Sequence, residues 1–218
     1  MDNNIFFSIP LLLHVLDLFG VMVFAVTGAL KAIQYKMDMV GVIILASSTG
    51  LAGGIIRDLL LDRLPPKIIL DPYYLTIAVA TGIIVFFLHP FFKERENLFL
   101  KFDAIGLGVF TIIGSSIAYE MLGLNFLAMS LAGIFTAIGG GIVRDVFVKE
   151  IPLVFIKELY ATASFLGIII FFLMLYFDFN YYISMVFCIV IITLFRLLAI
   201  KYNWNLPTKI LFKKRDRE

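Results

Sequence analysis

The sequence Gly-Gly-Ile-Ile-Arg-Asp at residues 53–58 returns as Gly-Gly-Ile-Val-Arg-Asp at residues 140–145, which is 87 positions later. The same offset places Pro65 onto Pro152. Each copy sets two glycines and a pair of opposite charges within a long apolar stretch. This combination predicts two related halves, each with charged side chains in an apolar environment.

The similarity extends beyond the hexapeptide in both directions. Downstream, the offset of 87 maps Tyr73 onto Tyr160. Upstream, the offset is 86, and the pattern Asp-x-x-Gly-x-x-x-Phe-x-x-x-Gly begins at Asp17 and again at Asp103. Apolar sequence does not easily place acids, prolines and tyrosines in the same order by chance, so the chain contains an internal repeat.

The composition identifies the class of protein. The chain has 218 residues, of which 61% are hydrophobic and 16% are charged, and its mean hydropathy is +1.01. A soluble domain of this size needs more polar surface, and one membrane-spanning helix needs roughly 20 apolar residues. We therefore expect an all-α integral membrane protein. The seven predicted transmembrane helices are about 9–30, 38–62, 71–90, 98–119, 122–148, 155–177 and 180–200.

These helices form a single membrane domain over residues 1–218. The first three-helix repeat covers 9–90 and the second covers 98–177, followed by a seventh helix at 180–200 and a basic tail at 201–218. Three is an odd number of crossings, so the second repeat must have the opposite orientation in the membrane. Inverted repeats of this kind are typical of secondary transporters and some channels.

Lysine and arginine are distributed unequally between the two predicted sides. The connections on one side contain 2 of these residues, whereas those on the other side, including the C-terminal tail, contain 14. The excess of positive charge predicts an N-terminus outside the cell membrane and a C-terminus in the cytoplasm. We interpret the basic tail from Lys209 as a topology determinant, and the alternative is a contact with anionic membrane lipids.

Glycine runs interrupt the second helix of each repeat, at 50–54 and 139–141. Each glycine destabilises a helix by about 1 kcal/mol relative to alanine, so these runs predict a kink or an unwound turn. The alternative is close packing of helices through small residues. The residues expected to form an ion pathway are Ser47, Ser48, Thr49, Gly50, Gly53, Gly54 and Asp58 in the first repeat and Thr136, Gly139, Gly140, Gly141 and Asp145 in the second.

Charged residues within the predicted spans sort by depth. Asp17 and Arg57 are expected near the outer end, and Asp103 and Arg144 near the inner end. Charges at such depth are costly unless they are paired or face a wet cavity. We therefore expect Arg57 to pair with Asp17 and Arg144 with Asp103, as structural ion pairs.

Asp58 and Asp145 follow the two arginines directly. Neighbouring side chains on a helix point about 100° apart, so we expect neither acid to be consumed by its own arginine. Each cluster then holds two acids and one base. Two net-negative vestibules on either side of a glycine-lined constriction are typical of a cation pathway.

At these residues the chain resembles the prokaryotic trimeric intracellular cation (TRIC) channels, a family also labelled as the glycine transporter (UPF0126) domain. The resemblance covers residues 10–200 and rests on the doubled Gly-Gly-x-x-Arg-Asp motif with its upstream aspartates. It implies two inverted triplets plus one helix, a homotrimer and a pore in each protomer. It also implies conduction of monovalent cations, mainly K+ (or Na+), with the second helix of each repeat kinked at its glycines to line the pore. The first repeat departs from the family's triple glycine at Ala52.

Other functions remain open at this point. Unwound helix ends also suit a secondary transporter of glycine or another small zwitterion. An intramembrane aspartyl protease is disfavoured because Asp58 and Asp145 are expected at opposite depths. A purely structural membrane protein is a third alternative. With one cysteine and two distant histidines, no metal site other than that of the permeant ion, no cofactor and no nucleic-acid partner are expected, and we expect no enzyme.

Overall fold

The computed structural model describes residues 11–91, 95–156, 159–202 and 204. Within these ranges every regular element is a helix. The long helices are α1 (Leu11–Gln34), α2 (Met39–Leu60), α4 (Pro72–Leu88), α5 (Arg95–Leu122), α6 (Phe126–Phe147), α8 (Ala161–Tyr176) and α9 (Tyr181–Lys201). The short ones are α3 (Lys67–Leu70), η2 (His89–Phe91) and α7 (Leu153–Ile156).

A long helix occupies each range for which the sequence predicts a transmembrane span. Five of them, α1, α2, α5, α6 and α9, are long and apolar enough to cross a membrane, whereas α4 and α8 are shorter apolar helices. The predicted start of the sixth span at residue 155 is wrong, because α8 begins at Ala161. The preceding apolar residues form the separate helix α7, and hydrophobicity alone does not distinguish a short helix from the start of a span.

Short polar side chains begin four of the long helices. Asp38, Asp71, Asn125 and Asn180 each accept a hydrogen bond from a backbone N–H in the first turn of the following helix. Such caps satisfy donors that have no partner within the helix itself. The loops thereby set where each helix starts.

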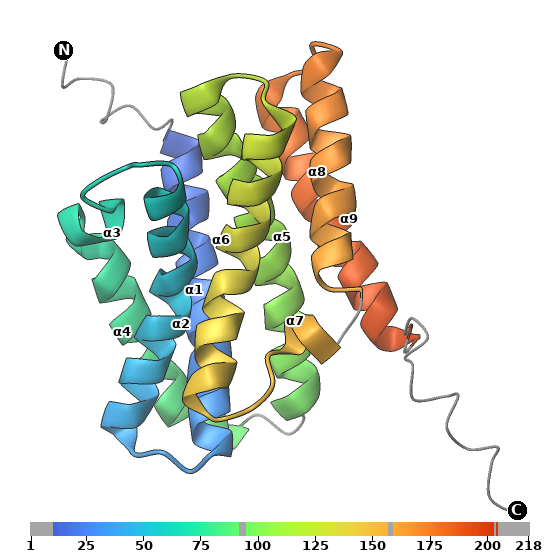
Figure 1. Cartoon of the computed structure of the whole chain (residues 1–218). Coiled ribbons are helices and arrows are strands. Elements are labelled where there is room, and N and C mark those ends of the chain that lie inside the picture. The colour runs from blue at the N-terminus through green and yellow to red at the C-terminus, as the bar shows by residue number, and fades with distance from the viewer. Residues whose placement is uncertain (1–10, 92–94, 157–158, 203, 205–218) are drawn as a thin grey trace, which may run out of the picture.

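The long helices run alternately up and down the molecule (Figure 1). α1 descends from the end at which the described chain begins, α2 returns and α4 descends, whereas α5 ascends, α6 descends and α8 ascends. The most extensive contacts join α1 to α2, α5 to α6, α2 to α6 and α1 to α5. These four helices form the centre. α4 packs against α1 and α2, and α8 and α9 pack against α5.

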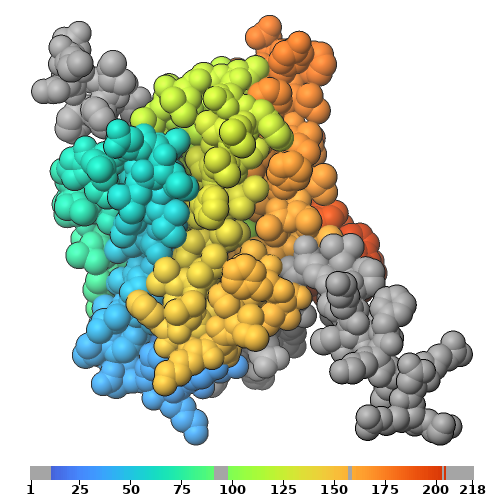
Figure 2. Space-filling model, viewed as in Figure 1, coloured from blue at the N-terminus to red at the C-terminus, as the bar shows by residue number. Residues whose placement is uncertain are grey.

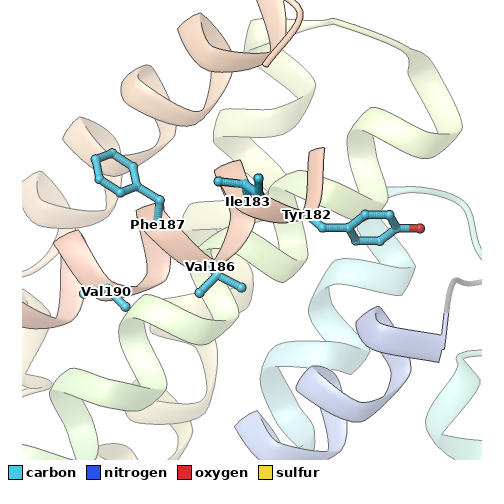
Figure 3. Close-up of a pocket in the computed structure, with 5 residues that line it drawn as sticks. All are labelled: Tyr182, Ile183, Val186, Phe187 and Val190. Carbon is cyan, nitrogen blue, oxygen red and sulfur yellow. The ribbon is translucent and has the colours of Figure 1, made fainter. Parts of the chain in front are cut away.

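Two faces of the molecule differ in how they are covered. In the space-filling view, side chains of α6 fill the middle of the face between α2 and α8 (Figure 2). By contrast, α9 presents an open apolar groove lined by Tyr182, Ile183, Val186, Phe187 and Val190 (Figure 3). Exposed apolar side chains in such a patch suit contact with lipid.

Candidate functional site

The two glycine runs lie where α2 and α6 cross. A Cβ atom added to Gly53 would lie 2.3 Å from the backbone oxygen of Thr136, and one added to Gly140 would lie 2.3 Å from the backbone oxygen of Thr49. Both contacts are far below a normal van der Waals distance. The two contacts are equivalent under the repeat, because the offset of 87 relates Gly53 to Gly140 and Thr49 to Thr136. Glycine is therefore required on both sides of the crossing.

Neither glycine run is unwound. α2 is a continuous α-helix from Met39 to Leu60, and α6 is continuous from Phe126 to Phe147. The prediction of an unwound turn is therefore wrong, and the alternative of packing through small residues explains the runs. The backbone of each helix occupies the space that a side chain at Gly53 or Gly140 on the other helix would fill. This close packing accompanies regular helical structure through both glycine runs. A kink within these helices remains a prediction.

The remaining glycines of the two runs also meet neighbouring segments. Gly50 packs against α1, Gly54 packs against α3, and Gly139 packs against α2. A Cβ on Gly141 would reach the hydroxyl of Tyr160 at 3.4 Å, which is an ordinary contact. The sequence-predicted glycines thus lie at helix contacts.

Hydroxyl side chains accompany the crossing. Thr49 and Thr136 are fully buried, and each hydroxyl donates a hydrogen bond to the backbone oxygen four residues earlier, at 2.6 and 2.5 Å. Ser47 and Ser48 are half-buried, and the Ser47 hydroxyl has no hydrogen-bond partner among the described residues. The hydroxyl protons of both threonines are therefore engaged in hydrogen bonds within their own helices. The lone pairs of the threonine oxygens and the hydroxyl of Ser47 are left as polar groups inside the protein.

The first ion-pair cluster joins α1, α2 and α4. Arg57 donates from Nη1 to both carboxylate oxygens of Asp17, at 3.1 and 3.2 Å. Tyr74 donates its hydroxyl to Asp17 at 2.8 Å. Arg57 is completely buried and Asp17 is 2% exposed, so the expected partners meet away from solvent.

The second cluster joins α6, α5 and α1. Arg144 Nη1 donates to Asp103 at 2.9 Å and to the Thr27 hydroxyl at 3.1 Å. Its guanidinium carbon lies 4.5 Å from the centre of the Phe99 ring, a cation–π contact. Arg144 and Asp103 are both completely buried. Because α2 and α6 end at opposite ends of the bundle (Figure 1), the two clusters lie at opposite ends.

Asp58 and Asp145 do not remain unpaired, so that prediction is wrong. Nε of Arg57 donates to Asp58 at 2.9 Å, and Nε of Arg144 donates to Asp145 at 2.8 Å. Both acids are at most 1% exposed. The angle of about 100° between neighbouring positions does not prevent the contact. The arginine side chain is long and flexible, and its Nε lies closer to the helix backbone than its terminal nitrogens do, so it can reach the next residue.

The same two acids also hold the segments that follow α2 and α6. Asp58 accepts a hydrogen bond from the backbone N–H of Lys67, the first residue of α3, at 2.9 Å. Asp145 accepts one from the backbone N–H of Leu153, the first residue of α7, at 3.0 Å. Each Arg-Asp pair therefore joins the end of a central helix to the short helix after it.

The charge of the first cluster differs from the prediction. Arg63 is 7% exposed, and its Nη1 lies 3.8 Å from Asp58. Near it, Lys67 donates to Nδ1 of His14 at 2.9 Å, and Nε2 of that histidine lies 3.5 Å from Asp71. The predicted net charge of −1 is wrong for this end, because the chain folds Arg63 back onto the acids. The sequence places that residue in a loop and gives no sign of its contact.

The second cluster is bordered by an ion pair that sequence reasoning missed. Lys31 donates to Glu150 at 2.6 Å, and the Tyr35 hydroxyl also donates to this carboxylate. Burial raises the pKa of Glu150, but the hydrogen bonds from Lys31 and Tyr35 outweigh it, so the pKa is lowered from its ordinary value of 4.5. These residues are more than one hundred positions apart, so no local pattern could have revealed the pair.

Tyr74, and not Tyr73, is the structural counterpart of Tyr160. Tyr74 is 1% exposed and Tyr160 is 2% exposed, whereas Tyr73 is 65% exposed. The offset is therefore 86 again at this position, although it is 87 from Gly53 to Pro65. The adjacent tyrosines made the alignment ambiguous, and only burial resolves it.

The fold and its two buried Arg–Asp clusters define a polytopic α-helical membrane protein with two related halves. The chain belongs to the UPF0126 family, and the sequence pattern described as glycine transporter matches residues 14–90 and again residues 100–176. It is 36% identical over 200 residues to the UPF0126 inner membrane protein YadS of Escherichia coli K12, covering 91% of this chain and 96% of YadS.

Solved structures of TRIC channels have the same fold. The TRIC trimeric intracellular cation channel orthologue from Rhodobacter sphaeroides superposes with a TM-score of 0.85 at 31% identity, over 89% of this chain and 100% of that chain. A prokaryotic TRIC channel in 0.5 M KCl superposes with a TM-score of 0.83 at 36% identity, over 89% of this chain and 98% of that one.

Proposed function

We propose that the protein is a channel for monovalent cations, chiefly potassium, with a pathway inside each protomer of a homotrimer. The observation that carries this proposal is the likeness to solved TRIC cation channels, at TM-scores of 0.83 and 0.85 and identities above 30%. At this similarity the arrangement of the helices is shared over about nine tenths of this chain.

The proposed architecture is seven transmembrane helices in two inverted triplets. α1, α2 and α4 form one triplet, α5, α6 and α8 form the other, and α9 is additional. The opposite directions of the corresponding helices (Figure 1) and the two successive family matches support it. The excess of lysine and arginine on one side favours an N-terminus outside and a C-terminus in the cytoplasm. The basic tail beyond Trp204 lies outside the described residues, so its contact with anionic lipid remains a prediction.

The pathway is proposed to run between the four central helices. Thr49 and Thr136 supply buried oxygen atoms there, and Ser47 supplies an unsatisfied hydroxyl. Oxygen atoms of this kind can replace part of the hydration shell of a potassium ion. Asp58 and Asp145 attract cations to the two ends of the pathway through their negative electrostatic field. The field of Asp145 is the stronger of the two, because the positive charge of Arg63 offsets that of Asp58.

Carrier-mediated transport of glycine is the second candidate, and the description of the matching family favours it. Potassium efflux and glycine counterflow from liposomes that contain purified protein separate the two functions. The channel predicts potassium efflux that does not saturate with glycine, together with no counterflow. Saturable glycine counterflow without potassium efflux would support the carrier and contradict the channel. Protein-free liposomes provide the background.

A further inference from the structure

Two phenylalanines meet at the centre of the helix bundle. Phe24 on α1 and Phe110 on α5 are equivalent under the offset of 86. Both are completely buried. Their ring centres are 5.1 Å apart and the rings are inclined at 69°, an edge-to-face contact. Neither ring takes part in the ion-pair clusters.

Each ring packs against a glycine of the other repeat. A Cβ on Gly20 would lie 2.6 Å from the ring of Phe110, and one on Gly106 would lie 2.3 Å from the ring of Phe24. The Phe24 ring also touches α6, because a Cβ on Gly140 would lie 2.9 Å from it. Each ring therefore fills space that exists only because the facing helix has no side chain there.

The position of the pair along the helices places it between the two charged clusters. Asp17 lies seven residues before Phe24, and Asp103 lies seven residues before Phe110. Seven residues of α-helix span about 10 Å. α1 and α5 run in opposite directions (Figure 1), so the two acids lie on opposite sides of the ring pair. A pathway from one cluster to the other through the central helices must pass the two rings.

We propose that Phe24 and Phe110 form the gate of the ion pathway, closed in this structure. This inference rests on the proposed channel function. Two apolar rings in contact leave no room for hydrated potassium and offer it no ligand, and apolar constrictions of this kind close a pathway by excluding water. Opening requires the rings to separate. The contact of Phe24 with Gly140 links that movement to the crossing of α2 and α6.

A pair of serine substitutions tests the gate directly. Phe24→Ser and Phe110→Ser shorten the side chain and place an unpaired hydroxyl in the closed arrangement, which burial disfavours. We expect potassium efflux from liposomes to rise by about tenfold or more for each variant, because the closed state loses stability relative to the open one. Phe171→Ser is the matched control, since Phe171 on α8 is also completely buried but its ring lies against Tyr181, at the start of α9.

Two alanine substitutions on α5 keep both rings and provide a second test. Gly106→Ala displaces the Phe24 ring. Gly108→Ala is the matched control, because its Cβ would lie 2.5 Å from the side chain of Thr193 on α9 instead. We expect potassium efflux to rise for Gly106→Ala and to stay at the wild-type level for Gly108→Ala. If the serine variants do not fold, the comparison of Gly106→Ala with Gly108→Ala is sufficient to test the gate.

The outcomes separate the gate from the channel. Potassium efflux that is equal in wild type, Gly106→Ala and every folded serine variant would overturn the gate but leave the channel standing. Equal increases in Gly106→Ala and Gly108→Ala would also overturn it, because the effect would then reflect general loosening of α5. If the wild type and all variants exchange glycine but release no potassium, the protein is not a channel, and the proposed gate is overturned as well.

Discussion

Removal of the carboxylate of Asp17 should destabilise the protein strongly, because two buried cations, Arg57 and Arg63, are then left with one acid, Asp58. In Asp17→Asn, Arg57 loses a charged partner that accepts two hydrogen bonds, at 3.1 and 3.2 Å. Arg57 keeps Asp58, and Tyr74 can still donate to the amide oxygen. Breaking one side of a buried ion pair costs about 3–5 kcal/mol. For a chain of this length the loss lowers the midpoint of thermal unfolding by roughly 10 °C.

The assay is thermal unfolding of purified protein in one detergent, followed by the fraction that stays monodisperse after heating. Asp38→Asn is the matched control, because Asp38 caps α2 and asparagine caps a helix about as well as aspartate. The double variant Asp17→Asn/Arg57→Gln should recover part of the loss, because it removes the excess positive charge and leaves Arg63 opposite Asp58. An unfolding midpoint of Asp17→Asn within about 2 °C of the control, a shift of less than about 1 kcal/mol, would show that the carboxylate of Asp17 does not stabilise the cluster.

Three further predictions concern the crossing, the second cluster and the field at the two ends. Gly53→Ala should destabilise the protein by about 1–3 kcal/mol, measured by thermal unfolding, because its Cβ would lie 2.3 Å from the backbone oxygen of Thr136. Glu150 has a lowered pKa, so its ion pair stabilises the fold above pH 4.5 and loses this effect as the pH falls through the folded-state pKa. When thermal unfolding is measured against pH, Glu150→Gln should therefore remove this acidic loss of stability. Asp145→Asn should lower single-channel potassium conductance more than Asp58→Asn, and chiefly at low ionic strength, because salt screens the field.

Each of these predictions has a result that would contradict it. Gly41→Ala is the control for the crossing, since its Cβ would meet only side chains, at 3.0 Å or more; equal loss of stability in both glycine variants would contradict the crossing. An unchanged acid limb in Glu150→Gln would show that its ion pair does not affect stability. Equal conductance in the two asparagine variants would show that Arg63 does not offset the first cluster.

Much of the architecture could be predicted from the sequence because its signals are local or repeated. Apolar runs located the long helices to within a few residues at most ends. The doubled motif identified which segments correspond. Depth alone assigned Asp17 to Arg57 and Asp103 to Arg144, because a buried charge requires a partner at its own level.

The remaining features depend on contacts between distant segments. The role of Gly53 depends on how closely α6 approaches, which a single sequence does not contain. The pairing of Lys31 with Glu150 and the return of Arg63 to Asp58 depend on where the loops fold. The short helices α3 and α7 are too short to produce a periodic signal, and their first residues are held by side chains of the preceding helices.

Recordings of purified protein in a planar bilayer under a tenfold KCl gradient show whether cations pass through the chain. A potassium channel gives discrete unitary currents whose reversal potential approaches about 59 mV in magnitude, with the sign set by potassium. A reversal potential with the sign set by chloride, or the absence of unitary currents from protein that exchanges glycine in liposomes, would show that the chain has no cation-selective pathway.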